Sequence, residues 1–282
     1  METFALNRAR YASEYARLGA ALGVSDVSPA PGELEFLTSI TSRDWKQIGM
    51  LAAPEVFFAA AVASILAPSF ALEIGTASGF SAAIFAKVLA LRESERGAPR
   101  NGPLVHTIDK RAEFVFDPAQ PVGYAIDLVA PELRPRIAVH PRQDSSFCAS
   151  LTNNGELRFA FVDGNHRHPW PLTDVLRIQD LMRDGWILMH DVDLPAEVEK
   201  ARSAGHGYDV TAVYGAKHVF DFWPGDKIRA GNIGAVRIPR DRRSLGELVA
   251  KLRELPAEVN PDRWTKQWRA IEALRLGFFH RR

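Results

Sequence analysis

The fold class can be predicted from one stretch, Phe70-Ala-Leu-Glu-Ile-Gly-Thr-Ala-Ser-Gly-Phe-Ser-Ala-Ala-Ile-Phe-Ala86. It begins with a short apolar run that is typical of a buried strand and carries one acid, Glu73. Gly75 and Gly79 then enclose a tight turn, after which apolar residues recur at helical spacing as far as Leu91. A strand, a glycine turn and a helix in this order predict the first βα unit of a nucleotide-type binding fold.

The spacing of the two glycines indicates the kind of ligand. Glycine lets the backbone of such a turn approach a ligand without a Cβ in the way. The spacing is Gly-x-x-x-Gly preceded by Glu73, which differs from the Gly-x-Gly-x-x-Gly of dinucleotide-binding turns, and no Walker lysine follows. We therefore expect the amino-acid or ribose end of a ligand to pack on the turn, and not a pyrophosphate.

The rest of the chain alternates strand-like runs with helical segments. This alternation predicts an α/β fold with a Rossmann-like, doubly wound and mostly parallel sheet. Further strands are expected at residues 104–109, 136–140, 157–163, 186–191, 209–214 and 232–238. The last two strands lack a clear crossover helix, which predicts an antiparallel edge; a helical segment interrupted by prolines is expected over 111–133, and a loop or hairpin over 217–231.

The chain divides into three predicted parts. Residues 1–67 read as helical segments that form either a cap over the ligand cleft or a dimerisation arm. Residues 68–240 form the predicted ligand-binding core, and residues 241–282 a helical tail with segments at 244–255 and 262–276. The second tail segment is basic and aromatic, and such a helix can lie on a membrane surface. Because the net charge is near zero, we expect it instead to dock on the core or on a second subunit, which leaves a homo-oligomer open.

Composition excludes several classes of protein. The chain has 282 residues and a formal net charge of +1, so no overall charge attracts it to nucleic acid. The single cysteine, Cys148, excludes an intrachain disulfide and suits a reducing compartment. The N-terminus has no secretory signal pattern, and the most apolar stretch, residues 56–72, is broken by Pro68. We expect a cytoplasmic protein without stable membrane insertion.

Polar residues follow the ends of the predicted strands. Asp109, Asp163 and the pair His190-Asp191 end three of them, and Asp144 follows a fourth. Ligands of open α/β sheets bind outside the carboxyl ends of the strands. One such acid alone could simply cap a helix, but the repetition at one rim favours a site because an unpaired buried carboxylate is costly.

The ordered set of segments 72–81, 106–109, 161–166 and 185–191 resembles the class I S-adenosylmethionine-dependent methyltransferases, and among them the small-molecule O-methyltransferases. The resemblance covers residues 70–240 and implies S-adenosylmethionine as cofactor and a small-molecule acceptor. The residues that it implies for cofactor binding are Gly75, Ala77 and Gly79 at the methionine and ribose part, Glu73 orienting the turn and the amino end, Asp109 at the ribose hydroxyls, and Asp144 with Ser145 at the adenine edge.

The resemblance also implies a metal site. Metal-dependent sugar and catechol-type members of the family place a Mg²⁺-binding acid at the positions of Asp163 and Asp191. His190 stands where the sugar enzymes have an acid, and a histidine ligand suits a transition metal better than Mg²⁺. The implied site is therefore Asp163, His190 and Asp191 with Mg²⁺ or another divalent metal, although His190 could instead be a hydrogen-bonded core histidine.

The expected catalytic base is His166. Asn165 stands where related enzymes can carry a basic aspartate, and an amide cannot take a proton at neutral pH. Histidine titrates in the range that a general base needs. His168 is the alternative base, and both histidines could instead cap the helix that begins near Pro171.

Two other functions share the open sheet. An NAD(P)-dependent oxidoreductase is disfavoured by the absence of Gly-x-Gly-x-x-Gly. A non-catalytic protein that binds S-adenosylmethionine is disfavoured by the acids and histidines at the rim. The identity of the acceptor (sugar, polyketide, phenol or amine) is open.

Overall fold

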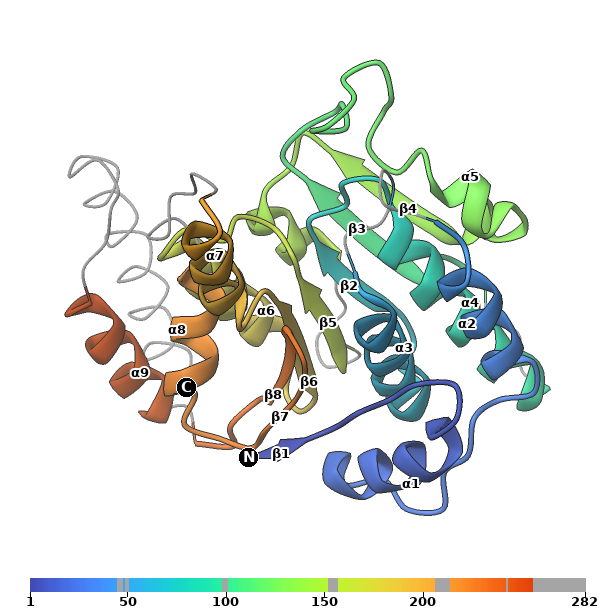
Figure 1. The fold of residues 1–282 in the computed structure, drawn as a ribbon, viewed down its shortest axis with the longest axis horizontal. Helices are drawn as coiled ribbons and strands as arrows, with labels where there is room; N and C mark the ends of the chain where they lie inside the picture. Colours follow the sequence, from blue (N-terminus) through green and yellow to red (C-terminus); the bar gives the residue numbers. More distant parts are fainter. Residues whose placement is uncertain are drawn as a thin grey trace.

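The computed structural model describes residues 1–44, 48, 51–97, 101–151, 157–205, 214–241 and 243–255. The described part contains an eight-stranded sheet in the order β1-β7-β8-β6-β5-β2-β3-β4 (Figure 1). The strands are β1 (Glu2–Thr3), β2 (Ala71–Ile74), β3 (Val105–Asp109), β4 (Ile137–Pro141), β5 (Phe159–Val162), β6 (Trp186–His190), β7 (Lys227–Ala230) and β8 (Ile233–Arg237).

The sheet is mostly parallel, as expected. Strands β4, β3, β2, β5 and β6 are parallel neighbours, whereas β8 is antiparallel to both β6 and β7. An antiparallel edge region was predicted, and β8 is part of it, but its hairpin partner β7 lies outside the two strands from which that edge was expected. The short strand β1, which the sequence pattern did not predict, extends this edge by pairing parallel with β7.

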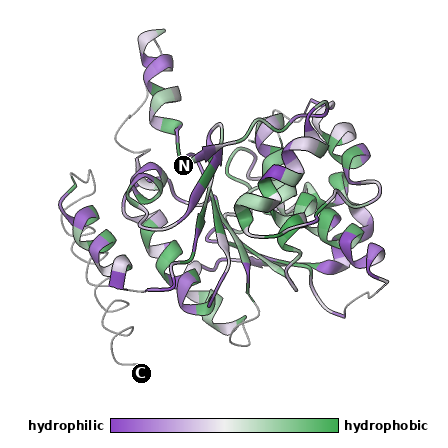
Figure 2. Ribbon diagram, turned by 90° about the horizontal axis from the view of Figure 1, so that it is seen from below, coloured by the Kyte–Doolittle hydropathy of each residue, from purple (hydrophilic) through white to green (hydrophobic). Residues whose placement is uncertain are grey.

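Helices cover both faces of the sheet (Figure 1). They are α1 (Tyr11–Leu22), α2 (Glu33–Thr41), α3 (Ala53–Leu66), α4 (Phe80–Glu95), α5 (Ile126–Val129), α6 (Trp170–Leu181), α7 (Leu194–Ser203), α8 (Gly215–Phe222) and α9 (Arg243–Arg253), with 3₁₀ turns η1 (Pro131–Arg136) and η2 (Ser145–Ser150). Figure 2 shows that apolar residues concentrate towards the sheet and polar residues outside.

The two faces of each central strand belong to two separate hydrophobic cores. In β5, Phe159 and Phe161 pack with α1 to α4, whereas Ala160 and Val162 pack with α6, α8 and α9. This alternation follows from the two-residue period of a strand, and it makes the sheet doubly wound. The fold class predicted from the sequence is confirmed.

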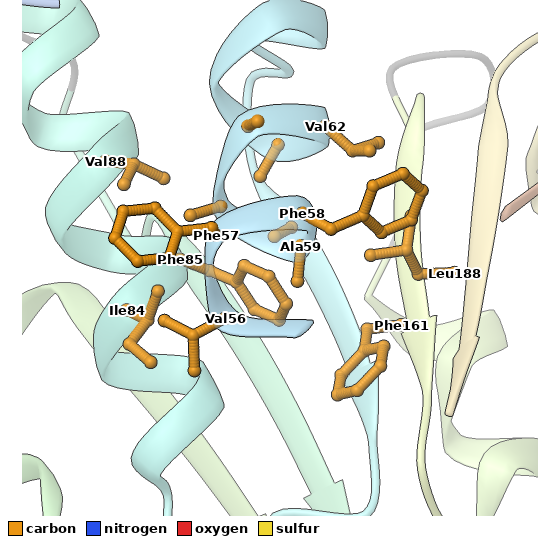
Figure 3. Packing of buried hydrophobic residues seen from close by; sticks show 14 of the residues in the cluster. Val56, Phe57, Phe58, Ala59, Val62, Ile84, Phe85, Val88, Phe161 and Leu188 are labelled. Carbon is orange, nitrogen blue, oxygen red and sulfur yellow. The ribbon is translucent and has the colours of Figure 1, made fainter. Parts of the chain in front are cut away.

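Helix α3 lies inside the first core. Figure 3 shows Phe57 and Phe58 of α3 between Phe85 of α4 and Phe161 and Leu188 of the sheet. The helix is apolar on all sides, as expected for a buried helix. Among the described residues, no helix is both long and apolar enough to cross a membrane.

The structure corrects two local expectations. Residues 111–133 do not form one interrupted helix: a bridge joins Glu113 to Pro121, and only the short α5 is helical before η1. Within 217–231, where a loop or hairpin was expected, α8 and β7 are present. The tail helix expected at 244–255 is observed as α9, whereas the strand at 209–214, except Tyr214, and the segment at 262–276 lie outside the described residues.

Candidate functional site

The glycine turn between β2 and α4 is shaped by its neighbours. Gly75 has φ +103°, and a Cβ there would lie 2.2 Å from the carbonyl oxygen of Asp163. Gly79 has φ +86°, and its Cβ would lie 2.8 Å from the Cα of Gly123. Both positions therefore require glycine, because the turn lies directly against the end of β5 and against the segment that leads to α5.

Glu73 lies in β2, just before the glycine turn, and is hydrogen-bonded to the elements around it. Its buried carboxyl accepts hydrogen bonds from Ser81 Oγ and Thr107 Oγ1, each at 2.5 Å. Burial raises the pKa of Glu73 to about 8, although these two hydrogen bonds oppose the shift. The side chain thus connects β2, α4 and β3 inside the fold, and its role in orienting the turn stays a prediction.

Asp109 lies beside the turn at the end of β3. Its Oδ2 accepts the backbone N–H of Ala77 at 2.9 Å, and its Oδ1 accepts the N–H of Arg111 at 2.8 Å. The side chain is only half-buried. Each carboxylate oxygen keeps a lone pair for a further donor, so the group can still accept hydrogen bonds from a ligand.

Asp144 and Ser145 follow β4 at the start of η2. Asp144 caps this turn by accepting the N–H of Ser146 at 2.7 Å, and its Oδ1 lies 3.3 Å from Arg177 Nη1. The buried Ser145 hydroxyl donates to Asp174 at 2.5 Å. Burial raises the pKa of Asp174 to about 6. The carboxylate of Asp144 is thus the more accessible of the two predicted groups.

Asp163, His190 and Asp191 come together as predicted. Each offers one ligand atom, and the three atoms lie within 4.8 Å of one another. His190 Nδ1 lies 3.1 Å from Asp163 Oδ1 and 3.5 Å from Asp191 Oδ1. Burial alone would lower the pKa of His190, but the nearby carboxylates hold it well above its usual value.

Asp191 is fixed in an unusual backbone conformation. Its φ of +61° lies in the left-handed region, and Asn232 Nδ2 donates to its Oδ1 at 2.7 Å. Burial raises the pKa of Asp191, whereas His190 and His166 act in the opposite direction. Asn232, in the turn between β7 and β8, was not identified from the sequence, because nothing in its local pattern connects it to the rim.

The structure separates the two candidate bases. His166 is half-buried, and its Nδ1 lies 3.1 Å from Asp191 Oδ2. His168 is buried, and its Nε2 lies 3.0 Å from the carbonyl oxygen of Leu252 in α9. Burial lowers the pKa of His168 to about 4. Of these two histidines, only His166 contacts the cluster of Asp163, His190 and Asp191.

A further acid of the cluster was missed by sequence reasoning. Glu55, near the start of α3, places Oε2 3.4 Å from His190 Nε2. The only signal was a glutamate at the position where helices often carry a capping acid. That signal explains a helix start and gives no indication of a contact with β6.

Part of the chain is similar to a known protein family. Residues 72–192 match a family model described as a methyltransferase domain. The match runs from β2 to just beyond β6, so it contains the glycine turn, Asp109 and the three predicted metal ligands. This part of the chain therefore resembles a methyltransferase domain, which agrees with the resemblance to the class I, S-adenosylmethionine-dependent methyltransferases.

Several solved structures are similar to the chain at low identity. An O-methyltransferase from Bacillus cereus in complex with SAH is 16% identical over 82% of this chain and 99% of that chain, with a TM-score of 0.45. The O-methyltransferase TomG from Streptomyces achromogenes, in complex with SAM, is 17% identical over 82% of this chain and 98% of that chain, with a TM-score of 0.44. The SAH-bound methyltransferase PaMTH1 from Podospora anserina is 18% identical over 85% and 86% of the two chains, with a TM-score of 0.41. No curated protein matches the sequence.

Proposed function

We propose that the protein transfers a methyl group from S-adenosylmethionine to a hydroxyl of a small molecule, with help from a divalent metal. One observation carries the proposal: Gly75 of the glycine turn lies directly against the backbone of Asp163. The turn expected to bind the cofactor and the cluster expected to bind the metal and the acceptor are therefore adjacent. Methyl transfer needs this adjacency, because the acceptor oxygen must approach the methyl group closely.

The residues around the turn suit S-adenosylmethionine. The half-buried carboxylate of Asp109 has lone pairs left for the ribose hydroxyls, and it lies next to Ala77. In this proposal Gly75, Ala77 and Gly79 line the methionine and ribose part, Glu73 supports the turn, and Asp144 faces the adenine edge with Ser145 behind it. When bound, the cofactor supplies an activated methyl group on a sulfonium.

The donor set of the cluster suits a divalent metal. Asp163 and Asp191 offer carboxylate oxygens and His190 offers an imidazole nitrogen, a combination that Mn²⁺, Co²⁺ or Zn²⁺ accepts more readily than Mg²⁺. Such an ion would hold the acceptor hydroxyl and lower its pKa. His166 would take the hydroxyl proton, and Asp191 would orient the imidazole of His166 through the 3.1 Å contact.

The proposed function includes the kind of acceptor, the compartment and the roles of the two terminal parts of the chain. We propose a small hydroxylated molecule such as a sugar, polyketide or phenol, and a cytoplasmic enzyme that forms no complex with nucleic acid. Residues 1–67 would cap the cleft or contribute to a homo-oligomer. The tail over 241–282 would dock on the core, as α9 supports by packing with α6 and α8.

Methyl transfer can be tested directly with the purified chain. Methyl-labelled S-adenosylmethionine is incubated with a panel of catechols, sugars and amines, in the presence of Mg²⁺, Mn²⁺ or Co²⁺ and separately in EDTA. We expect label on a hydroxylated acceptor and loss of labelling in EDTA. Full labelling in EDTA would contradict metal assistance, and labelling of amines alone would contradict the hydroxyl acceptor.

A further inference from the structure

The imidazole of His190 is held from both sides by carboxylates. Nδ1 faces Asp163 at 3.1 Å, and Nε2 faces Glu55 at 3.4 Å. His190 is 6% exposed and Glu55 is 7% exposed, so both groups are shielded from bulk water. The two carboxylates are far apart in the sequence. Asp163 follows β5, whereas Glu55 lies in α3, the helix before β2.

Glu55 is fixed without help from His190. Its Oε2 accepts the backbone N–H of Ala52 at 2.7 Å, which caps the first turn of α3. Helix α3 is itself immobilised in the core between α4 and the sheet (Figure 3). The carboxylate is therefore presented to His190 by a rigid element.

The position of Glu55 determines which nitrogen of His190 can give up its proton to a metal ion. A carboxylate accepts a hydrogen bond from each ring nitrogen, Asp163 from Nδ1 and Glu55 from Nε2, so both nitrogens carry a proton when no metal is bound. A metal ion held by Asp163 and Asp191 would replace the proton on Nδ1, whereas the proton on Nε2 would stay with Glu55. Nδ1 faces Asp163 and Asp191, the other two predicted ligands.

We propose that Glu55 is a positioning residue that holds His190 in the Nδ1-ligating tautomer and thereby builds the metal site. A metal-bound histidine commonly donates its second N–H to a carboxylate, which fixes the ring and makes the ligand more basic. This inference rests on the metal site of the proposed function. It adds that the N-terminal helical part supplies the outer layer of that site, and that nitrogen ligation selects Co²⁺ or Mn²⁺ over Mg²⁺.

Cobalt binding to the full chain tests the proposal. Co²⁺ is titrated into the purified protein and into Glu55→Gln, and both the dissociation constant and the visible absorption spectrum are recorded. Glutamine is similar in shape but lacks the charge. We expect Glu55→Gln to weaken Co²⁺ binding by about 10- to 100-fold and to change the spectrum of the bound ion. Mg²⁺ should compete only weakly for the wild-type site.

Ala52→Pro is the matched control. It removes the N–H that Glu55 caps and leaves the carboxylate in place, and the backbone of Ala52, at φ −68°, already suits proline. We expect this variant to weaken Co²⁺ binding much less than Glu55→Gln does, because α3 still holds the charged carboxylate of Glu55 beside His190. Equal weakening in both variants would assign the effect to helix capping and overturn the proposal.

Two other results would also overturn it: wild-type protein that binds no divalent ion, or Glu55→Gln that binds Co²⁺ like the wild type with the same spectrum. The second result leaves the proposed methyl transfer intact, because labelling of an acceptor is measured separately. Circular dichroism of each variant establishes that it is folded.

Discussion

At the scale of single residues, the pair His166 and Asp191 carries the proposed chemistry. Asp191 is fixed by Asn232 and by its own backbone conformation, and it holds His166 Nδ1 at 3.1 Å. The opposite nitrogen, Nε2, is then available to take a proton. A base acting in this way contributes about 10²- to 10⁴-fold to a rate.

Replacing His166 with glutamine should therefore lower kcat by about 10²-fold or more. Because His166 is half-exposed and has no part in the glycine turn, the affinity for S-adenosylhomocysteine should stay unchanged. Steady-state kinetics and calorimetric titration measure the two quantities. A kcat close to that of the wild type would assign the proton transfer to another group.

Glu73 should make the stability of the protein depend on pH. Its pKa is raised to about 8 by burial, so the folded protein retains a proton that the unfolded chain loses at about pH 4.5. Stability should therefore fall as the pH rises from about 4.5 to 8, by up to about 1.4 kcal/mol per pH unit.

Glu73→Gln removes this titration and keeps the shape of the side chain. The free energy of unfolding of both proteins is measured with urea at pH 5 and pH 8. From pH 5 to pH 8 the wild type should lose more stability than Glu73→Gln does. A constant difference at the two pH values would show that Glu73 has the same pKa in the folded and unfolded states.

At the scale of elements, a buried polar network fastens the first three helices to α4. Tyr11 of α1 donates to Glu33 of α2 at 2.7 Å, and Ser64 of α3 donates to the same carboxyl at 2.6 Å. Arg92 of α4 donates to Ser64 at 2.8 Å and also contacts Tyr15 and the carbonyl of Ser28. The network connects the N-terminal helices to the part that bears the site.

Arg92→Leu should lower the free energy of unfolding by about 3–5 kcal/mol, because it leaves the buried Glu33 without its cation. The matched control is Glu95→Gln, which removes the more exposed partner of the same arginine and should cost about 0–1 kcal/mol. Urea unfolding measures both. Equal losses for the two variants would contradict the importance of the buried network.

A pair of histidines, His106 of β3 and His140 of β4, joins two neighbouring strands. His106 Nδ1 lies 3.1 Å from His140 Nε2, and the two rings are stacked. Burial and the neighbouring His140 lower the pKa of His106 to about 4. In the unfolded chain His106 binds a proton at about pH 6.5, whereas in the folded protein it does so only at about pH 4. The free energy of unfolding should therefore fall as the pH drops from about 6.5 to 4.

His106→Phe removes that titration and keeps an aromatic ring against Phe70. Between pH 7.5 and pH 5 the variant should lose less stability than the wild type, by about 1.4 kcal/mol per pH unit at most. Unfolding curves at the two pH values test this. Identical losses would mean that the pair titrates alike in the folded and unfolded chains.

Most elements could be predicted because their apolar periods are regular. β2, α3 and α4 have such patterns, and their positions were predicted to within a few residues. The prediction of a helical segment over 111–133 was wrong because Pro118 and Pro121 favour turns and a bridge joins Glu113 to Pro121. β1 has only two residues, too few for a period, and its pairing with β7 depends on the far end of the chain.

At the scale of the whole molecule, the sheet order brings together residues that are distant in sequence. The rim acids of β5 and β6 could be predicted as neighbours because parallel strands align their carboxyl ends. Glu55 and Asn232 could not, since one comes from a helix and the other from a hairpin turn. Their contacts depend on how α3 and β8 pack on the sheet, which no local pattern specifies.

The proposed methyl transfer depends first on the binding of S-adenosylmethionine by the glycine turn and Asp109. The most direct test is calorimetric titration of S-adenosylhomocysteine and, separately, NADH into the wild type and Asp109→Asn. We expect the wild type to bind S-adenosylhomocysteine and not NADH, and Asp109→Asn to bind at least about tenfold more weakly, because a charged hydrogen-bond acceptor is lost. Binding of NADH would instead indicate a dinucleotide site, and S-adenosylhomocysteine binding that Asp109→Asn leaves unchanged would show that Asp109 does not hold the cofactor.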